Sequence, residues 1–338
     1  MSKMSELASQ QTRTLRDRNE LLFYRLLSRQ PQGWTTKYEP GIRANPREAP
    51  RRSRPSLVYA AFLGRDIHLL SVPERKAALL ALYNPSLFSI QEQLVLSTDP
   101  WPHPLDGYPG VSGMPWFRGT VDVAVRLGCI SSHPRVTIRN PSGGSEMLRA
   151  PMPYVGDLLL FLKGPDNSPH CVNWTVKKDG NGFRRGLGLK QTPAGQVREE
   201  ERSQRRHEIE KVYYQDVGIP TVRVTEADID TNVAANLQVS YTYLNRTTQL
   251  DAGSQEILTH RYGEIIGSKI SALECARSLC AVLDCTLDDC KVVLHQAIWK
   301  RKLRVDLFRP VLFDRPLNIE TCDVLGRYAY WFARRASS

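Results

Sequence analysis

Two charged residues stand at the ends of two apolar runs, twenty positions apart. Asp157 opens the run DLLLFL and Lys177 closes the run CVNWTVK, with GPDNSP (164–169) between them. Turn-forming residues between two apolar runs predict a β-hairpin. With the turn centred near Asn167, Asp157 is expected directly opposite Lys177, where Cβ atoms lie about 4.5–5.5 Å apart on one face. An acid and an ammonium group are therefore expected at one edge of the predicted sheet.

A second acid decides which chemistry is open to this pair. Glu74 lies in the segment SVPE, at the start of an expected helix over 71–83. Ser71 and Glu74 fit a capping box, which explains the glutamate without any function. Likewise, Asp157 and Lys177 alone would make an ordinary cross-strand ion pair. If the helix brings Glu74 beside the hairpin, however, two carboxylates could hold Mg²⁺, which prefers oxygen ligands. The ammonium group beside them would stabilise developing negative charge.

These residue types are also those of a known nuclease site. An Asp and a Lys on adjacent strands are the skeleton of the PD-(D/E)xK site, in which carboxylate-bound Mg²⁺ activates water for phosphodiester hydrolysis. More specifically, the chain resembles TnsA, the endonuclease subunit of heteromeric cut-and-paste transposases. The resemblance covers about 65–319, more loosely in its C-terminal part, with a long insertion around 100–150. The stretches that carry it are HLLSVPERKAALLALYNPSLFSIQEQLVLS (68–97), YVGDLLLF (154–161), NWTVK (173–177) and RRHEIEKVYYQDVGIPTVRVTEADI (205–229).

The resemblance implies roles for individual residues. Glu74 matches the family's helix acid, Asp157 its strand acid and Lys177 its lysine. Thr175 departs from the pattern, since the middle acid of the motif, often Gln in this family, is expected there. A hydroxyl is a poor metal ligand beside a carboxylate. Two Mg²⁺ ions, for which Mn²⁺ could substitute, would therefore depend on Glu74, Asp157 and the backbone carbonyl of Val176.

The resemblance further implies a reaction and its partners. The expected activity is Mg²⁺-dependent endonuclease cleavage of the 5′ (non-transferred) strand at transposon ends, leaving a 3′-hydroxyl. The expected partners are transposon-end DNA, a TnsB-type transposase and a TnsC-type ATPase regulator. Two alternatives stay open. One is a non-catalytic DNA- and partner-binding transposition subunit, which Thr175 favours, and the other is a stand-alone restriction or repair nuclease.

Four further acids compete for a place in the site. Glu92, on an expected strand, is either a supporting acid or a solvated edge residue, the second being the default. Asp122 alternates with valines in a strand-like segment over 120–127 and rivals Asp157 as the strand acid, but no lysine follows it at hairpin spacing. Glu208 and Glu210 lie on an expected charged helix, where i,i+4 pairing with basic residues is the ordinary explanation.

Cysteines recur every five residues at positions 275, 280, 285 and 290. On one continuous helix a five-residue step turns the side chain by about 140°. Structural zinc sites usually pair cysteines two to four residues apart. The spacing therefore predicts small buried side chains in a helical core and no metal site.

The elements that must position these residues suggest an α/β fold. We expect a restriction-endonuclease-like core with a mixed sheet, followed by a helical, winged-helix-like domain. The expected divisions are a basic N-terminal extension (1–55), a catalytic domain (56–240) and a C-terminal domain (241–338). In the last, three helices precede a small hairpin, the pattern of a winged helix. The expected helices are 14–29, 71–83, 199–217, 256–266, 272–283 and 287–300, the expected strands 58–63, 136–139, 157–162, 171–177 and 220–224, and the expected hairpin arms 303–307 and 311–313.

Basic residues are concentrated in two places. The proline-rich segment 43–54 is expected to be an extended, solvated arm, either a solubilising linker or an arm that follows a phosphate backbone. Lys300, Arg301, Lys302 and Arg304 end the last helix and begin the expected wing. There they are either helix-terminal charges or DNA contacts.

Composition limits the class of protein. The chain has 338 residues, is 41% hydrophobic and carries a formal charge of +11, which excludes wholly disordered and fibrous proteins and favours a polyanionic partner. No apolar run reaches the roughly 18 residues that a bilayer crossing needs. The polar N-terminus lacks a signal-peptide core, and an odd number of cysteines, seven, argues against a disulfide framework. These features predict a reduced, cytoplasmic protein associated with the nucleoid and not with a membrane.

Overall fold

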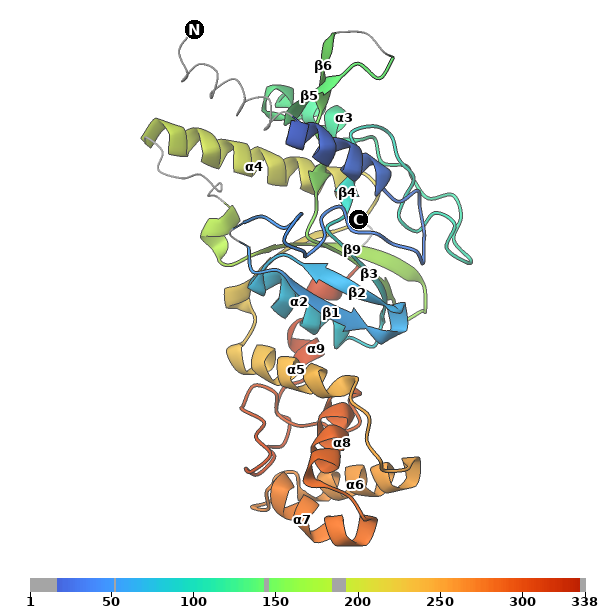
Figure 1. Ribbon diagram of the computed structural model, residues 1–338, viewed down its shortest axis with the longest axis vertical. Coiled ribbons are helices and arrows are strands. Elements are labelled where there is room, and N and C mark those ends of the chain that lie inside the picture. The colour runs from blue at the N-terminus through green and yellow to red at the C-terminus, as the bar shows by residue number, and fades with distance from the viewer. Residues whose placement is uncertain (1–16, 52, 143–145, 184–192, 335–338) are drawn as a thin grey trace. The chain divides into compact units, whose positions relative to one another are not determined.

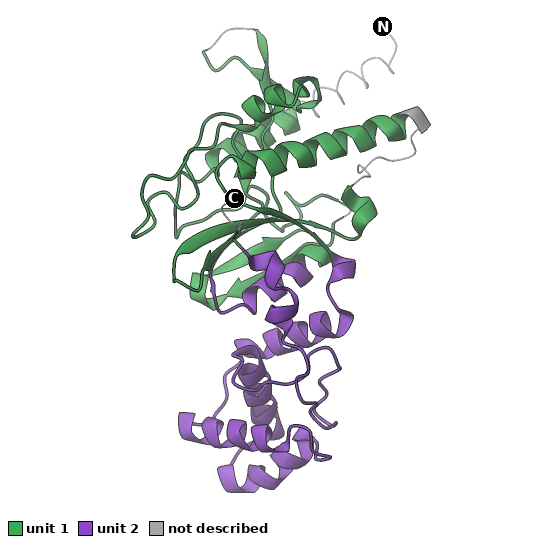
Figure 2. Ribbon diagram, turned by 180° about the vertical axis from the view of Figure 1, so that it is seen from behind, with its two compact units in different colours: residues 1–74, 88–225, 334–338 green, residues 75–87, 226–333 purple. Residues whose placement is uncertain are grey.

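The computed structural model describes residues 17–51, 53–142, 146–183 and 193–334 (Figure 1). The chain forms two compact units, shown in different colours in Figure 2. Unit 1 holds Met1–Glu74, Phe88–Thr225 and Arg334–Ser338, and unit 2 holds Arg75–Leu87 and Glu226–Ala333. The fold is mixed α/β with a mixed sheet, as predicted. The units divide at Thr225, whereas the expected boundary at 240 falls inside a helix, α5 (Thr231–Leu244).

A four-stranded sheet forms the centre of unit 1. Its strand order is β10 (Thr221–Thr225), β9 (Pro169–Lys177), β8 (Leu158–Lys163) and β3 (Leu87–Glu92). β8 is antiparallel to β9, and β10 is parallel to β9. Leu158–Leu162 of β8 are buried throughout, because the strand is covered on both faces.

One long helix, α4 (Pro193–Gln215), packs on one face of this sheet. Its buried Ile209 and Tyr214 share a hydrophobic core with Leu159 and Phe161, which are alternate residues of β8 and therefore face the same way. Burying these apolar groups stabilises the packing of the helix on the strand, by roughly 25 cal/mol for each Å² of apolar surface removed from water. α4 thus brings its polar residues to a fixed place beside β9.

Three two-stranded sheets complete the strands of unit 1: β1 (Ser56–Ala60) with β2 (Arg65–Leu69), β4 (Val95–Leu96) with β7 (Tyr154–Val155), and β5 (Arg135–Arg139) with β6 (Met147–Pro151). The strand-like segment predicted over 120–127 is instead a helix, α3 (Thr120–Arg126). Its buried residues are Thr120, Val123 and Ala124. That spacing, i, i+3 and i+4, is helical. The prediction was wrong because it took the alternating valines for the two-residue period of a strand.

The described part of the basic N-terminal segment is partly held by ion pairs. In the predicted arm, 43–54, Arg43 forms such a pair, whereas Arg47, Arg51 and Arg54 are exposed, as expected of a solvated arm. A helix over 17–28 precedes it. The Arg29 guanidinium donates two hydrogen bonds to Glu48, at 2.6 and 3.1 Å, and Arg43 donates to Glu39 at 2.7 Å. Hydrogen bonds from Arg29 and the Arg43 backbone, with the nearby positive charges, outweigh burial and lower the pKa of Glu48 to about 2. Internal acids therefore neutralise Arg29 and Arg43, of which only Arg43 belongs to the predicted arm.

Unit 2 is helical. After the body of α2 (Val72–Leu82) and α5, it contains α6 (Ala252–Ile265), α7 (Ala272–Leu283), α8 (Leu287–Trp299), α9 (Val324–Arg327) and α10 (Ala329–Phe332). The three helices predicted here are present, with boundaries within a few residues, whereas α5 was not predicted. Among the described helices, none combines the length and apolar character needed to cross a bilayer.

The predicted hairpin after α8 does not form strands. The described backbone has only an isolated bridge between Val305 and Ile319 there. Asn236 of α5 supplies the physical reason. Its amide donates to the carbonyls of Leu307 and Arg309, at 2.9 and 2.7 Å, and accepts from the Val311 amide at 3.0 Å. A side chain thus takes the backbone groups that a hairpin would have paired.

Candidate functional site

The hairpin of β8 and β9 has a register two residues from the predicted one. Leu158 pairs with Trp174, which places Thr175 and not Lys177 across from Asp157. The turn is centred one residue earlier than predicted, with Lys163 paired to Pro169. Side chains alternate with a period of two, so a two-residue shift keeps Lys177 on the same face as Asp157.

Asp157 and Lys177 nevertheless meet. The carboxylate Oδ2 of Asp157 accepts a hydrogen bond from the Val176 amide at 2.7 Å and lies 3.1 Å from the Lys177 Nζ. The same ammonium group donates to the Val176 carbonyl at 3.0 Å. A positive charge therefore lies between the two oxygen groups, Asp157 and Val176, that the sequence predicts as metal ligands.

Glu74 is held at the first turn of α2 by the predicted capping interactions. Its amide donates to the Ser71 hydroxyl at 3.3 Å, and its carboxylate accepts from that hydroxyl at 2.7 Å and from the Leu70 amide at 2.8 Å. The side chain is buried. Burial and the nearby charge of Asp157 raise the pKa of Glu74 to about 7. Two acids thus share one poorly solvated region, where a cation or a proton offsets their repulsion.

Gln93 joins the two acids, and sequence reasoning missed it. Its side-chain amide donates to Glu74 Oε2 at 3.0 Å, and its backbone amide donates to the Asp157 carbonyl at 3.0 Å. The residue follows β3 with a φ of 52°, a left-handed conformation uncommon outside glycine and asparagine. No turn residue marks this position in QEQL, so the sequence offers only its polarity as a signal.

Glu210 occupies a different environment from the one predicted. It is buried, and its carboxylate accepts from the Thr175 hydroxyl at 3.0 Å and from the Asn173 amide at 3.1 Å. Burial opposes its ionisation, but a hydrogen bond from His207 and nearby positive charges prevail and lower its pKa. Thr175, which stands where an acid was expected, is thus in contact with an acid supplied by α4. Glu208 is exposed on the same helix.

The other two candidate acids belong to ion pairs. Glu92 is fully buried and accepts from the Arg65 guanidinium at 2.8 and 3.0 Å, so it is not the solvated edge residue that was the default prediction. Burial still raises its pKa, despite the arginine. Asp122 lies on α3 and pairs with Arg126 at 2.8 Å, so it is not a strand acid.

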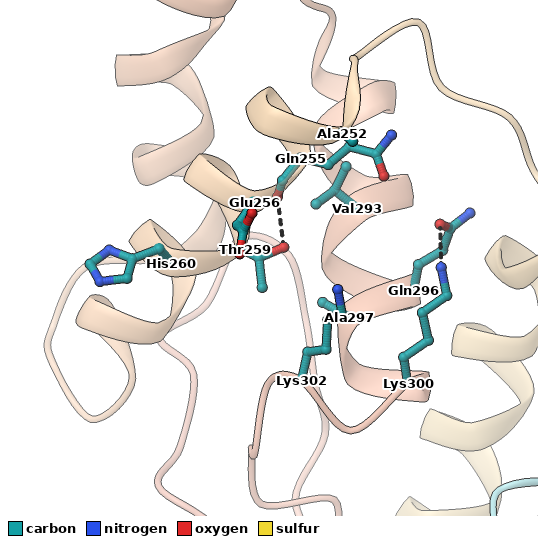
Figure 3. A pocket seen from close by; sticks show the side chains of 10 residues that line it. All are labelled: Ala252, Gln255, Glu256, Thr259, His260, Val293, Gln296, Ala297, Lys300 and Lys302. Atoms are coloured by element: carbon teal, nitrogen blue, oxygen red, sulfur yellow. Dashed lines mark hydrogen bonds between the residues drawn. The ribbon is translucent and has the colours of Figure 1, made fainter. Parts of the chain in front are cut away.

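The basic cluster after α8 divides into two pairs. Arg301 and Arg304 form ion pairs with Asp323, at 2.8 and 3.2 Å. Lys300 and Lys302 instead line a pocket of about 420 Å³ between α6 and α8 (Figure 3). Its other lining residues are Ala252, Gln255, Glu256, Thr259, His260, Val293, Gln296 and Ala297. The two lysines are therefore the members of this cluster best placed to meet an anion.

Comparison of the chain with protein-family models and with curated proteins finds no match. Function must therefore be inferred from the geometry of Glu74, Gln93, Asp157 and Lys177.

Proposed function

We propose that this chain is a metal-dependent DNA endonuclease, the TnsA-type subunit that cleaves the 5′ (non-transferred) strand at transposon ends. In this proposal unit 1 is a restriction-endonuclease-like core. The observation that supports it most is the linked set of Glu74, Asp157 and Lys177. Two acids from distant segments are tied together through Gln93, and the lysine contacts one of them at 3.1 Å.

The donor set suits a hard divalent cation. Glu74 and Asp157 offer carboxylate oxygens and Val176 offers a carbonyl oxygen, the ligand types that Mg²⁺ and Mn²⁺ take. The pKa of Glu74, raised to about 7, fits the same conclusion, because acids that repel one another attract a cation. Bound Mg²⁺, one ion or two, would supply Lewis-acid activation of water and charge neutralisation at the scissile phosphate.

The chain's own residues have separate tasks in this proposal. Gln93 holds the Glu74 carboxylate and the Asp157 backbone in a fixed relation. The amide of Val176 orients Asp157. Lys177 donates to the Asp157 carboxylate and lies where its ammonium can also stabilise charge that develops on the phosphate. Glu210 fixes Thr175 and adds a buried negative charge behind the hairpin.

Unit 2 would then serve binding. In this proposal α6, α7 and α8 form the helical part of a winged-helix-like domain in which an irregular segment over 303–313 replaces the predicted hairpin. Lys300 and Lys302 offer contacts to DNA phosphates. TnsB-type transposase and TnsC-type regulator remain the proposed protein partners, in the cytoplasm on nucleoid DNA. The runner-up is a DNA- and partner-binding subunit without catalysis, favoured by the hydroxyl of Thr175 in place of an acid.

Glu74→Gln tests the proposal, because glutamine preserves the size of the side chain and its capping role. We expect Mg²⁺-dependent nicking of transposon-end DNA, assayed with the partner transposase and ATPase, to fall below detection while folding is retained. Glu208→Gln, an exposed glutamate on α4, is the matched control and should nick normally. Equal nicking by both variants would reject Glu74 as a ligand. Absence of nicking by the unmodified chain would favour the binding subunit, and robust cleavage of any plasmid without partners would favour a stand-alone nuclease.

A further inference from the structure

The turn between α7 and α8 brings three cysteines together. α7 ends at Leu283, Asp284 adopts a left-handed conformation with a φ of 47°, and α8 begins after its cap, Thr286. This turn redirects the chain within a few residues, so cysteines five positions apart come to lie side by side. The expectation that these cysteines would lie on different faces was wrong because it took the helix to be continuous, and about 140° per step applies only within one helix.

The three thiols are Cys280, Cys285 and Cys290. The Sγ of Cys290 lies 3.9 Å from that of Cys280 and 3.6 Å from that of Cys285. All three sulfurs lie within 4.8 Å of one another. They are free thiols and not a disulfide. Among the described residues, this is the one group of three or more His, Cys, Asp or Glu side chains with ligand atoms so close.

The spacing of these sulfurs matches a thiolate metal site. Zinc–sulfur bonds are about 2.3 Å long, so two sulfurs of a regular tetrahedral site lie about 3.8 Å apart. The distances from the Cys290 sulfur to those of Cys285 and Cys280, 3.6 and 3.9 Å, lie on either side of that value. A soft thiolate set selects Zn²⁺ or Cu⁺ over Mg²⁺ or Ca²⁺.

The surroundings fix the position of Cys290. It is buried in the first turn of α8. The Tyr262 hydroxyl donates to the Cys290 carbonyl at 3.1 Å and fixes the backbone there.

We propose that Cys280, Cys285 and Cys290 bind one Zn²⁺ ion as three thiolates, releasing their thiol protons to solvent. Cys280 and Cys285 are only partly buried, so the fourth coordination position faces outward and takes a water in the isolated chain. The ion joins the end of α7 to the start of α8. This site is separate from the proposed nuclease site and does not depend on it.

Titration of the reduced full chain with Co²⁺ tests the site, because thiolate-bound tetrahedral Co²⁺ absorbs visibly. We expect one equivalent to bind, with sulfur-to-cobalt charge-transfer bands, and Zn²⁺ to displace it. Cys285→Ser changes a partly exposed turn residue, so folding should survive while affinity falls at least tenfold. Cys322→Ser, at an exposed cysteine, is the control and should bind normally.

Three results would overturn the proposal. They are no Co²⁺ bands in the reduced chain, equal binding by Cys285→Ser and the unmodified chain, and Zn²⁺ that fails to displace Co²⁺. Native mass spectrometry provides an independent count, and a chain that retains no zinc under conditions that keep the fold would also reject the site.

Discussion

The acid–lysine site of unit 1 and the three-cysteine site of unit 2 differ in how their charge is balanced. In unit 1, Asp157 is held by a backbone amide and already has a counter-charge, the Lys177 ammonium at 3.1 Å. In unit 2, three sulfurs lie within 4.8 Å of one another, and burial raises the pKa of Cys285 and Cys290. The first site is therefore charged and preorganised, whereas the second is neutral until a cation binds.

This difference in charge balance predicts which cation each site should select. Hard oxygen donors beside a lysine suit a weakly held Mg²⁺ ion that keeps several waters and meets a phosphate. Clustered thiols suit a tightly held, soft ion that displaces protons and joins two helices. Experiments that exchange the metals, or remove the charge of one site, can therefore test whether the two sites differ in metal preference.

After Glu74→Gln, the largest effect is expected from removing the ammonium of unit 1. Lys177→Met should lower the nicking rate about 10²- to 10³-fold, the usual cost of losing one group that stabilises transition-state charge. Lys178→Met, at the exposed neighbouring lysine, is the matched control and should retain the rate. Single-turnover nicking of end DNA at saturating Mg²⁺ measures both. If Lys177→Met nicks as fast as its control, the lysine is only an ion-pair partner.

The pKa of Glu74 predicts a pH-dependent stability in the absence of metal. A folded-state pKa raised from 4.5 to about 7 means that the folded chain binds the proton more tightly. This stabilisation is present below pH 4.5 and is lost as the pH rises through 7. The loss is about 3 kcal/mol.

Urea unfolding at pH 5 and pH 8, with EDTA, measures the change for the unmodified chain and for Glu74→Gln. The glutamine variant should show a smaller fall in unfolding free energy between the two pH values, because its amide does not titrate. Identical pH profiles for the two proteins would contradict the electrostatic account of this acid. Addition of Mg²⁺ should narrow the difference, since the cation replaces the proton.

Zinc should stabilise unit 2 by a similar or smaller amount. At a free Zn²⁺ concentration 100-fold above Kd, linkage gives about 2.7 kcal/mol. Thermal unfolding with and without Zn²⁺ should show a higher midpoint for the unmodified chain and for Cys322→Ser, but no rise for Cys285→Ser. A rise with Mg²⁺ that Cys285→Ser abolishes would erase the distinction between hard and soft sites.

The smallest expected effect concerns Thr175. Thr175→Val keeps the shape but removes the hydroxyl that donates to the buried Glu210 carboxylate at 3.0 Å. A hydrogen bond to a charged group contributes about 1.5 kcal/mol or more. Urea unfolding should show that loss. In a double-mutant cycle with Glu210→Gln the cost should shrink, because the partner charge is already gone. An unchanged cost would mean that Thr175 acts by packing alone.

Local patterns predicted the elements better than their details. The capping residues Ser71 and Glu74 predicted the start of α2, because an N-terminal cap is a property of four neighbouring residues. The apolar runs predicted β8 and β9, but not the turn centre between Lys163 and Pro169, which depends on Asp166 and Asn167. Periodicity alone read α3 as a strand.

The contacts that were not predicted join residues far apart in the sequence. Nothing near Gln93 in sequence indicates that its amide reaches Glu74, and nothing near Glu210 indicates that it meets Thr175. Both contacts arise when separate segments pack together. The prediction for the cysteines failed for a local reason. One left-handed residue, Asp284, redirects the chain between α7 and α8.

One helix has a consequence for dissecting the chain. α2 begins with Glu74 in unit 1, yet from Arg75 onward it belongs to unit 2, where Arg75 bonds Gln238 and Lys76 bonds Glu226, both at 2.7 Å. A protease cut or a gene truncation at residue 225 would separate this helix from Gln238 and would leave Glu226 outside the fragment that carries α2. Glu74 would then stand at the start of a helix that has lost these contacts. Its role should therefore be studied in the full chain.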